Sequence, residues 1–209
     1  MAETAQTLDR GLRLLGLVAA SPAGLTVTEA ATALGVGRAV VYRLVTTLAG
    51  HGLARRDGEG RIRLGAAVIG LARRAQPVVA EAARPALRRL AEDLGATAHL
   101  TIADNGEALA LAVVEPTWTA LHVGYRTGIR HPLDRGAAGQ AILAGRTGRP
   151  PYVVSSGELQ EGAHGIAASV PGECGIEASV GVVALAPLDP VAVGPRVVAA
   201  AAEVASALT

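Results

Sequence analysis

The chain has no lysine, no phenylalanine and only one cysteine, Cys174. A single cysteine rules out a disulfide within the chain and fits a reducing compartment. The first residues lack the charged and then apolar pattern of a signal peptide. The longest uncharged apolar stretch near the C-terminus, residues 178–188, is about half as long as a membrane span. We therefore expect a cytoplasmic protein that does not enter a membrane.

Residue patterns of common catalytic and cofactor sites are also missing. The five histidines form no pair at i, i+4 spacing and no cluster with cysteine, so no metal site is expected. The sequence lacks a Gly-x-Ser-x-Gly elbow, a phosphate-binding Gly-x4-Gly-Lys loop and a dinucleotide fingerprint. We therefore expect no metal, no cofactor and no catalytic residues. An enzyme built on the C-terminal half is a minor alternative.

The charges are divided unevenly along the chain. Residues 1–75 contain ten arginines against five acidic residues, a net charge of +5. Residues 76–209 contain nine arginines against thirteen acidic residues, a net charge of −4. A basic part beside a mildly acidic part is typical of a chain in which one part binds a polyanion. Taken alone, the asymmetry is also compatible with a chance distribution of surface charge.

The N-terminal part shows the start and stop signals of three short helices and a hairpin. Apolar residues at helical spacing predict a first helix, which ends at the Ser-Pro-Ala-Gly stretch of residues 21–24. A capping box over residues 26–29 starts a second helix that stops at Gly35, and a third helix is expected over residues 38–49. Residues 53–64 contain an Asp-Gly-Glu-Gly turn between two short strands, which predicts a β-hairpin.

The residues at the junction of the second and third helices predict a helix-turn-helix. Two helices that cross steeply need a small residue where they touch, which Ala31 supplies, and the turn needs a residue that tolerates positive φ, which Gly35 supplies. Val36, Val41 and Leu44 have the spacing to bury against the preceding helix. With the hairpin as a wing, this is a winged helix-turn-helix. The alternatives are a three-helix subdomain with a solvated basic face, or a winged helix that docks a protein.

In this motif the N-terminal part of the third helix enters the major groove of double-stranded DNA. Arginines on its outer face reach guanine edges or phosphates, and tyrosine and threonine hydroxyls reach phosphates. The wing strands carry four more arginines, close to the expected path of the DNA backbone. The predicted DNA-binding residues are Thr28, Arg38, Ala39, Tyr42, Arg43, Thr46, Thr47, Arg55, Arg56, Arg61 and Arg63.

Two helical stretches follow the wing. The first, residues 66–75, is predicted to be a linker helix that ends before Pro77, and the second, residues 79–94, is amphipathic. The predicted domains are residues 1–65 for the winged helix-turn-helix, 66–76 for the linker helix and 77–209 for the C-terminal domain.

After Gly95 the hydrophobic period changes from helix to strand. Hairpin turns are expected at residues 104–106 and 171–175, and a further strand over residues 120–125. Short helices are expected over residues 136–144 and 197–208. Helices before and after a mainly antiparallel sheet predict an α+β domain.

Several short motifs occur in a fixed order along the chain. They are Leu34-Gly35-Val36-Gly37, Tyr42-Arg43-Leu44-Val45-Thr46-Thr47-Leu48, Arg61-Ile62-Arg63-Leu64-Gly65, Gly128-Ile129-Arg130-His131-Pro132-Leu133 and Gly136-Ala137-Ala138-Gly139-Gln140-Ala141-Ile142-Leu143-Ala144. In these motifs the chain resembles the IclR family of bacterial regulators. The resemblance implies a winged helix-turn-helix, a linker helix and a GAF-like effector-binding domain. It also implies a homodimer, with tetramers in some members, and a small organic acid or aromatic effector.

By position, the resemblance also implies a mostly apolar effector cavity in the C-terminal domain. Its residues would be Ala120, Val123, His131, Ala137, Ala138, Ser155, Ala163, Gly165, Gly181 and Val183. Backbone N–H groups at the start of the helix near Gly136 would hold a carboxylate. His131 is equally compatible with a surface loop.

The chain departs from the family pattern at three places. Ala39 and Val40 stand where serine or threonine is usual, Gln140 stands where lysine is usual, and residues 146–151 replace additional helices. We expect a DNA-binding transcriptional regulator whose operator affinity is modulated by a small molecule. The alternative is a regulator whose shortened C-terminal domain binds no ligand and only dimerises.

Overall fold

The computed structural model describes residues 5–119, 123–148, 150–172 and 176–209. The chain divides into two compact units, residues 1–75 and residues 76–209, and each is described by itself. No helix in the described part of the chain has both the length and the hydropathy that crossing a bilayer requires.

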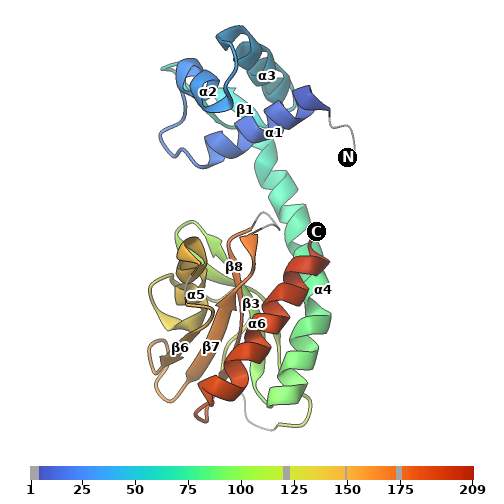
Figure 1. Cartoon of the computed structure of the whole chain (residues 1–209), viewed down its shortest axis with the longest axis vertical. Helices are drawn as coiled ribbons and strands as arrows, with labels where there is room; N and C mark the ends of the chain where they lie inside the picture. The colour runs from blue at the N-terminus through green and yellow to red at the C-terminus, as the bar shows by residue number, and fades with distance from the viewer. Residues whose placement is uncertain (1–4, 120–122, 149, 173–175) are drawn as a thin grey trace. The chain divides into compact units, whose positions relative to one another are not determined.

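The first unit contains three helices and a two-stranded antiparallel wing (Figure 1). The elements are α1 (Gln6–Ala19), α2 (Val27–Leu34), α3 (Arg38–Gly50), β1 (Ala54–Arg56) and β2 (Ile62–Leu64). Strand β1 pairs with β2 so that Arg55 lies opposite Arg63. The predicted winged helix-turn-helix is therefore confirmed.

The turn between α2 and α3 is built as its residues predict. The Thr26 hydroxyl accepts a hydrogen bond from the Glu29 N–H at 3.2 Å, and the Glu29 carboxylate accepts one from the Thr26 N–H at 2.7 Å. Because Thr26 bonds the Glu29 carboxylate, the pKa of that group is lowered. Gly35 ends α2 at φ 65°, in the left-handed region. Ala31, Val41 and their neighbours then form a single small core.

Helix α4 (Ala67–Leu94) is continuous, and the predicted interruption at Pro77 is wrong. A proline removes one N–H donor, but its own φ of about −65° is helical, so the chain continues on a helical path. A second proline, Pro85, lies inside the same helix. Beyond it, Leu87 and Leu90 are buried and anchor the C-terminal part of α4 to the sheet of the second unit.

The second unit contains a six-stranded antiparallel sheet in the order β5-β4-β3-β8-β7-β6. Its strands are β3 (Thr97–Asp104), β4 (Glu107–Val114), β5 (Arg130–Pro132), β6 (Val153–Ser156), β7 (His164–Ser169) and β8 (Ala178–Ala184), and its helices besides α4 are α5 (Gly136–Thr147) and α6 (Pro190–Ala207). The predicted α+β class is therefore confirmed.

The predicted hairpin at residues 104–106 is present, and β7 pairs antiparallel with β8 as the second predicted hairpin requires, although residues 173–175 of its turn lie outside the described residues. Asn105 and Gly106 join β3 to β4 with φ of 53° and 82°, which is the two-residue turn that an Asn-Gly pair favours. The prediction of a strand over residues 120–125 is wrong for residues 123–125, which form no strand. Residues 120–122 lie outside the described residues. Strand β5 was not predicted, and α6 begins at Pro190, earlier than expected.

The two faces of the sheet have different chemistry because side chains alternate along each strand. On β3, Ala98 and Leu100 face the side covered by α4 and α6, where they join the main core (Figure 1). Helix α5 packs on the opposite face, through Ala137 and Ala141 against Ala167 of β7. The same face carries the buried polar residues of β3, namely Thr97, His99 and Thr101.

The main core generates a prediction about stability. Leu87 has an exposed fraction of 0% and Leu185 one of 46%. We expect Leu87→Ala to lower the free energy of unfolding by about 2–5 kcal/mol, because it removes buried contacts and leaves a cavity. Leu185→Ala is the matched control and should change it by less than about 1 kcal/mol. Urea denaturation followed by circular dichroism measures both, and equal effects would contradict the placement of the core.

Candidate functional site

The outer face of α3 is open to solvent in the first unit. All the α3 residues predicted to bind DNA are exposed, as is Thr28 at the start of α2; they are Arg38, Ala39, Tyr42, Arg43, Thr46 and Thr47. The threonine hydroxyls donate within the helix, Thr46 to the Tyr42 carbonyl at 2.9 Å and Thr47 to the Arg43 carbonyl at 3.1 Å. Their oxygens therefore remain available as acceptors, while their donors are used locally.

The wing adds a second basic element next to α3. The Arg56 guanidinium lies over the Tyr42 ring, 4.7 Å from its centroid, so the wing and α3 present one joined surface. Arg55 and Arg56 are exposed. Within the described residues, no carboxylate lies within ion-pair distance of Arg38, Arg43 or these two arginines. The surface therefore carries four uncompensated positive charges.

The other two wing arginines hold the unit together. Arg63 donates to the Asp57 carboxylate at 2.6 Å and to the Pro22 carbonyl at 2.9 Å, and Arg61 donates to the Gly24 carbonyl at 3.2 Å. The hydrogen bond from Arg63 lowers the pKa of the Asp57 carboxyl. Both arginines are half-buried. Their assignment to DNA stays a prediction, and their contacts give them a structural role.

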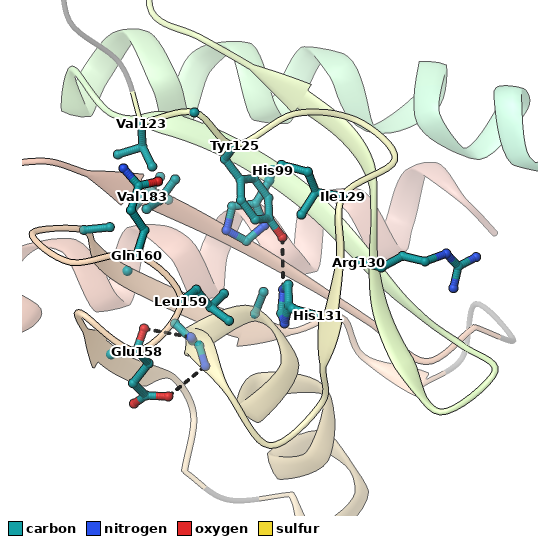
Figure 2. A pocket seen from close by; sticks show the side chains of 18 residues that line it. His99, Val123, Tyr125, Ile129, Arg130, His131, Glu158, Leu159, Gln160 and Val183 are labelled. Atoms are coloured by element: carbon teal, nitrogen blue, oxygen red, sulfur yellow. Dashed lines mark hydrogen bonds between the residues drawn. The ribbon is translucent and has the colours of Figure 1, made fainter.

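The second unit contains a cavity of about 220 Å³ on the polar face of its sheet. Its floor includes His99 of β3 and Val183 of β8, its side is the start of α5, and the loop between β6 and β7 contributes Glu158 and Leu159 (Figure 2). The remaining lining is largely apolar, which is typical of a small-molecule site.

Most residues predicted for this cavity do line it. They are Val123, His131, Ala137, Ala138, Ser155, Ala163, Gly165 and Val183. His131 has an exposed fraction of only 6%, so it is a wall residue and not a surface loop residue. Ala120 lies outside the described residues. Gly181 does not line the cavity, but a Cβ there would lie 2.7 Å from Cε1 of His99, so glycine leaves room for the imidazole.

Four polar side chains are linked at one end of the cavity. The Thr101 hydroxyl lies 3.1 Å from Nδ1 of His99 and 3.3 Å from the Tyr125 hydroxyl. The Tyr125 hydroxyl lies 3.3 Å from Nε2 of His131 (Figure 2). Nδ1 of His131 lies 3.0 Å from the Pro132 carbonyl, which only accepts, so this nitrogen carries the proton and Nε2 accepts from Tyr125. These side chains therefore largely satisfy one another.

Burial sets the protonation of this group. Desolvation, and secondarily repulsion from His131, lowers the pKa of His99 from 6.5 to about 3. Burial raises the pKa of the Tyr125 hydroxyl. Both side chains are therefore uncharged near neutral pH, and they offer the cavity neutral donors and acceptors.

Two backbone N–H groups at the start of α5 donate to side chains of the same unit. The Gly136 N–H donates to the Glu158 carboxylate at 2.8 Å, and the Ala137 N–H donates to the Ser155 hydroxyl at 2.8 Å. The Gln140 amide also donates to Glu158 at 2.8 Å. Glu158 and Ser155 thus satisfy two of the backbone donors that sequence reasoning reserved for a ligand carboxylate, while the N–H of Ala138, which also lines the cavity, has no hydrogen-bond partner among the described residues.

Sequence reasoning missed His99, Tyr125 and Glu158. The alternation Thr97-x-His99-x-Thr101 was the available signal, because three polar residues on one face of a buried strand need partners. Tyr125 and Glu158 had no local signal. They reach the cavity through loops whose paths depend on strand pairing across the sheet.

Comparison with known proteins agrees with both units. The model of the IclR helix-turn-helix domain matches residues 7–58, and that of the bacterial transcriptional regulator IclR C-terminal domain matches residues 75–149. The chain belongs to the IclR family. Among curated members of that family, the HTH-type transcriptional regulator BhcR of Paracoccus denitrificans is 37% identical over 66% of this chain and 50% of its own length. The chain spans about half the length of the curated relatives it matches.

Solved structures of IclR regulators share the fold. The putative IclR regulator from Silicibacter sp. TM1040 aligns over 97% of this chain and 96% of its own, with a TM-score of 0.59 and 21% identity. An IclR homologue from Microbacterium hydrocarbonoxydans, complexed with 4-hydroxybenzoate, aligns over 97% of this chain and 98% of its own, with a TM-score of 0.55 and 18% identity. At these identities the likeness establishes the IclR fold.

The depressed pKa of His99 predicts a pH dependence of stability. The unfolded chain binds a proton below pH 6.5, whereas folded His99 stays neutral down to about 3, so the unfolded state gains protons first. The free energy of unfolding should therefore fall as pH decreases from about 6.5 to about 3, by up to about 1.4 kcal/mol per pH unit from this group.

Chemical denaturation at a series of pH values tests this slope. His99→Gln should flatten it, while His51→Gln, which changes an exposed histidine of the first unit, should leave it unchanged. An equal slope in wild type and His99→Gln would show that His99 does not stay neutral in the fold.

Proposed function

We propose that the chain is a DNA-binding transcriptional regulator whose operator affinity depends on a small molecule in the cavity of the second unit. The observation that carries the DNA-binding part is the joined basic surface of α3 and the wing, where Arg38, Arg43, Arg55 and Arg56 have no carboxylate partner among the described residues. Some arginines elsewhere, such as Arg84 with Glu81 and Arg146 with Glu177, are paired, and the feature that distinguishes this surface is that four unpaired arginines gather on α3 and the adjoining wing.

Unpaired arginines on an exposed helix favour a polyanion, because binding releases counterions from the phosphates without breaking internal ion pairs. In a winged helix-turn-helix, the start of α3 lies in the major groove, which directs Arg38, Tyr42 and Arg43 to base edges and nearby phosphates. Arg56 stacks on Tyr42 and is therefore already ordered, which lowers the entropy cost of its contact with DNA.

The cavity supports the regulatory part. A ligand shifts a conformational equilibrium only by binding one state better than another, and a largely apolar cavity with a few polar groups is typical of a small-molecule site. The 4-hydroxybenzoate complex of the Microbacterium homologue supports a small molecule as the occupant. Helix α4 joins the two units in sequence, and we infer that it transmits the ligand's effect between them in a homodimer, which pairs further into tetramers in some family members.

Replacing one arginine of α3 tests the DNA-binding surface. We expect Arg38→Ala to weaken binding to the chain's own upstream DNA about 5- to 150-fold, as the loss of about 1–3 kcal/mol of contact energy predicts. Fluorescence anisotropy over a range of salt concentrations measures it. The matched control is Arg84→Ala, which removes an exposed but paired arginine outside this surface and should leave affinity unchanged. Unchanged affinity in Arg38→Ala would show that the predicted surface is wrong.

Exposed and internally bonded wing arginines should affect different measurements, DNA affinity for the first and thermal stability for the second. Arg55→Ala removes an exposed, unpaired charge and should weaken DNA binding while leaving the melting temperature unchanged. Arg63→Ala removes the hydrogen bonds to Asp57 and Pro22 and should lower the melting temperature. Differential scanning fluorimetry and anisotropy on the same samples measure both, and a reversed pattern would contradict the roles assigned here.

A further inference from the structure

The hydrogen bonds at the polar end of the cavity run in one direction, which the Pro132 carbonyl sets. In a neutral imidazole only one nitrogen carries a proton, and Nδ1 of His131 lies 3.0 Å from this carbonyl, which only accepts. Nδ1 therefore carries the proton, and Nε2 of His131 is a lone pair. The Tyr125 hydroxyl, 3.3 Å from Nε2, donates its single proton there (Figure 2). The Tyr125 oxygen then has no proton for any other contact.

The same proton count extends through Thr101 to His99. The Thr101 hydroxyl lies 3.3 Å from the Tyr125 oxygen, and because that oxygen can now only accept, Thr101 donates to it. Thr101 has then used its only proton. In its contact with Nδ1 of His99, at 3.1 Å, the ring nitrogen is therefore the donor. Reversing any of these bonds would leave two acceptors facing each other in a buried site.

Nε2 of His99 is consequently a lone pair that faces the cavity. Burial lowers the pKa of this imidazole to about 3, so it has one ring proton, and that proton is on Nδ1. Nε2 has no hydrogen-bond partner among the described residues. In that part of the chain, Thr97 Oγ1 is the one side-chain nitrogen or oxygen that is both sealed from solvent and unpartnered. The unpartnered Nε2 is therefore not sealed, and His99 lines the cavity.

Donors for a ligand anion lie elsewhere along the cavity. The Ala138 N–H at the start of α5 and the side-chain amide of Gln160 line it, and neither has a hydrogen-bond partner among the described residues. Both groups can donate to a carboxylate. Nε2 of His99 differs from them because it only accepts. An occupant that covers Nε2 without donating to it would leave a buried acceptor unpaired, which lowers affinity.

We propose that His99 selects a ligand that carries a hydrogen-bond donor, in the simplest case a hydroxyl group. Thr101, Tyr125 and the Pro132 carbonyl are positioning groups, because they hold the imidazole proton on Nδ1 and leave Nε2 to accept. A ligand whose group at this point only accepts, such as a ketone, an aldehyde or an ether, meets the lone pair and binds weakly. The inference rests on the proposed regulation by a small molecule and names one feature of that molecule.

The tautomer of His99 tests the inference without any ligand. Two-bond proton–nitrogen correlation spectra of the full chain, with isotopically labelled histidine and at about pH 8, distinguish protonated from unprotonated ring nitrogens. The signals that disappear in His99→Gln belong to His99. We expect a protonated Nδ1 and an unprotonated Nε2, and a protonated Nε2 would overturn the inference.

Replacing Tyr125 by phenylalanine should move the imidazole proton. In Tyr125→Phe the buried Thr101 hydroxyl keeps only Nδ1 of His99 as a partner, so it donates there and the ring proton moves to Nε2. Tyr152→Phe is the matched control. The Tyr152 ring lies against Gly194 of α6 and does not line the cavity, so this variant should leave the tautomer unchanged. An unchanged tautomer in Tyr125→Phe would show that the hydrogen-bond chain does not position the proton.

An alcohol and the matching aldehyde test the selection itself. The meta and para isomers of (hydroxymethyl)benzoate donate a hydrogen bond, whereas the formylbenzoates have the same skeleton and only accept. The chain contains no lysine that would form an imine with the aldehyde. Isothermal titration of the full chain at about pH 8 should show at least one alcohol binding about tenfold or more tightly than its aldehyde. In Tyr125→Phe the difference should fall below about threefold, because a protonated Nε2 donates to both.

Two binding results would contradict the proposal. If the wild-type chain binds aldehyde and alcohol equally, His99 does not select a donor, and the proposed regulation by a small molecule stands. If neither compound binds at millimolar concentrations, both the selection by His99 and the regulatory part of the proposed function fail. DNA binding by the arginine surface is decided separately by Arg38→Ala.

Discussion

The cavity of the second unit depends on the alternation of side chains along β3, the strand that pairs with both β4 and β8. Ala98 and Leu100 are buried under α4 and α6, so the intervening residues must point to the opposite face. Those residues are Thr97, His99 and Thr101. A shift of the strand by one residue would bury polar groups among the helices and expose the core, so the register that stabilises the unit also places the polar end of the cavity.

Local signals were sufficient to predict the first unit, whereas the predicted cavity residues came from the family resemblance and not from any local pattern. Capping at Thr26 and the positive φ of Gly35 act over a few residues, so their effects are visible in the sequence. Pro77 misled because a local rule about helix interruption was applied to a residue whose own φ is compatible with a helix. Tyr125 and Glu158 were missed because their positions follow from the pairing of distant strands, which no short motif encodes.

The wing arginines show that the sequence alone does not distinguish an arginine that is free to bind DNA from one that bonds within the fold. Arg55 and Arg63 lie opposite each other on the wing, yet one is exposed and the other bonds Asp57 and Pro22. The two arginines carry the same charge on adjacent strands. Nearby segments of the same chain determine which of them forms internal hydrogen bonds. The distinction needs the fold, because Pro22 and Asp57 approach Arg63 from outside the strand pair.

The position of His99 at the polar end of the cavity depends on Gly181 having no side chain. Residue 181 pairs with His99 across the strands, and even a methyl group there would meet both the imidazole and Cβ of Ala167, at 2.7 Å each. A side chain at position 181 would therefore require both the His99 imidazole and Ala167 to move. The imidazole therefore keeps its place at the polar end of the cavity only while position 181 carries no side chain.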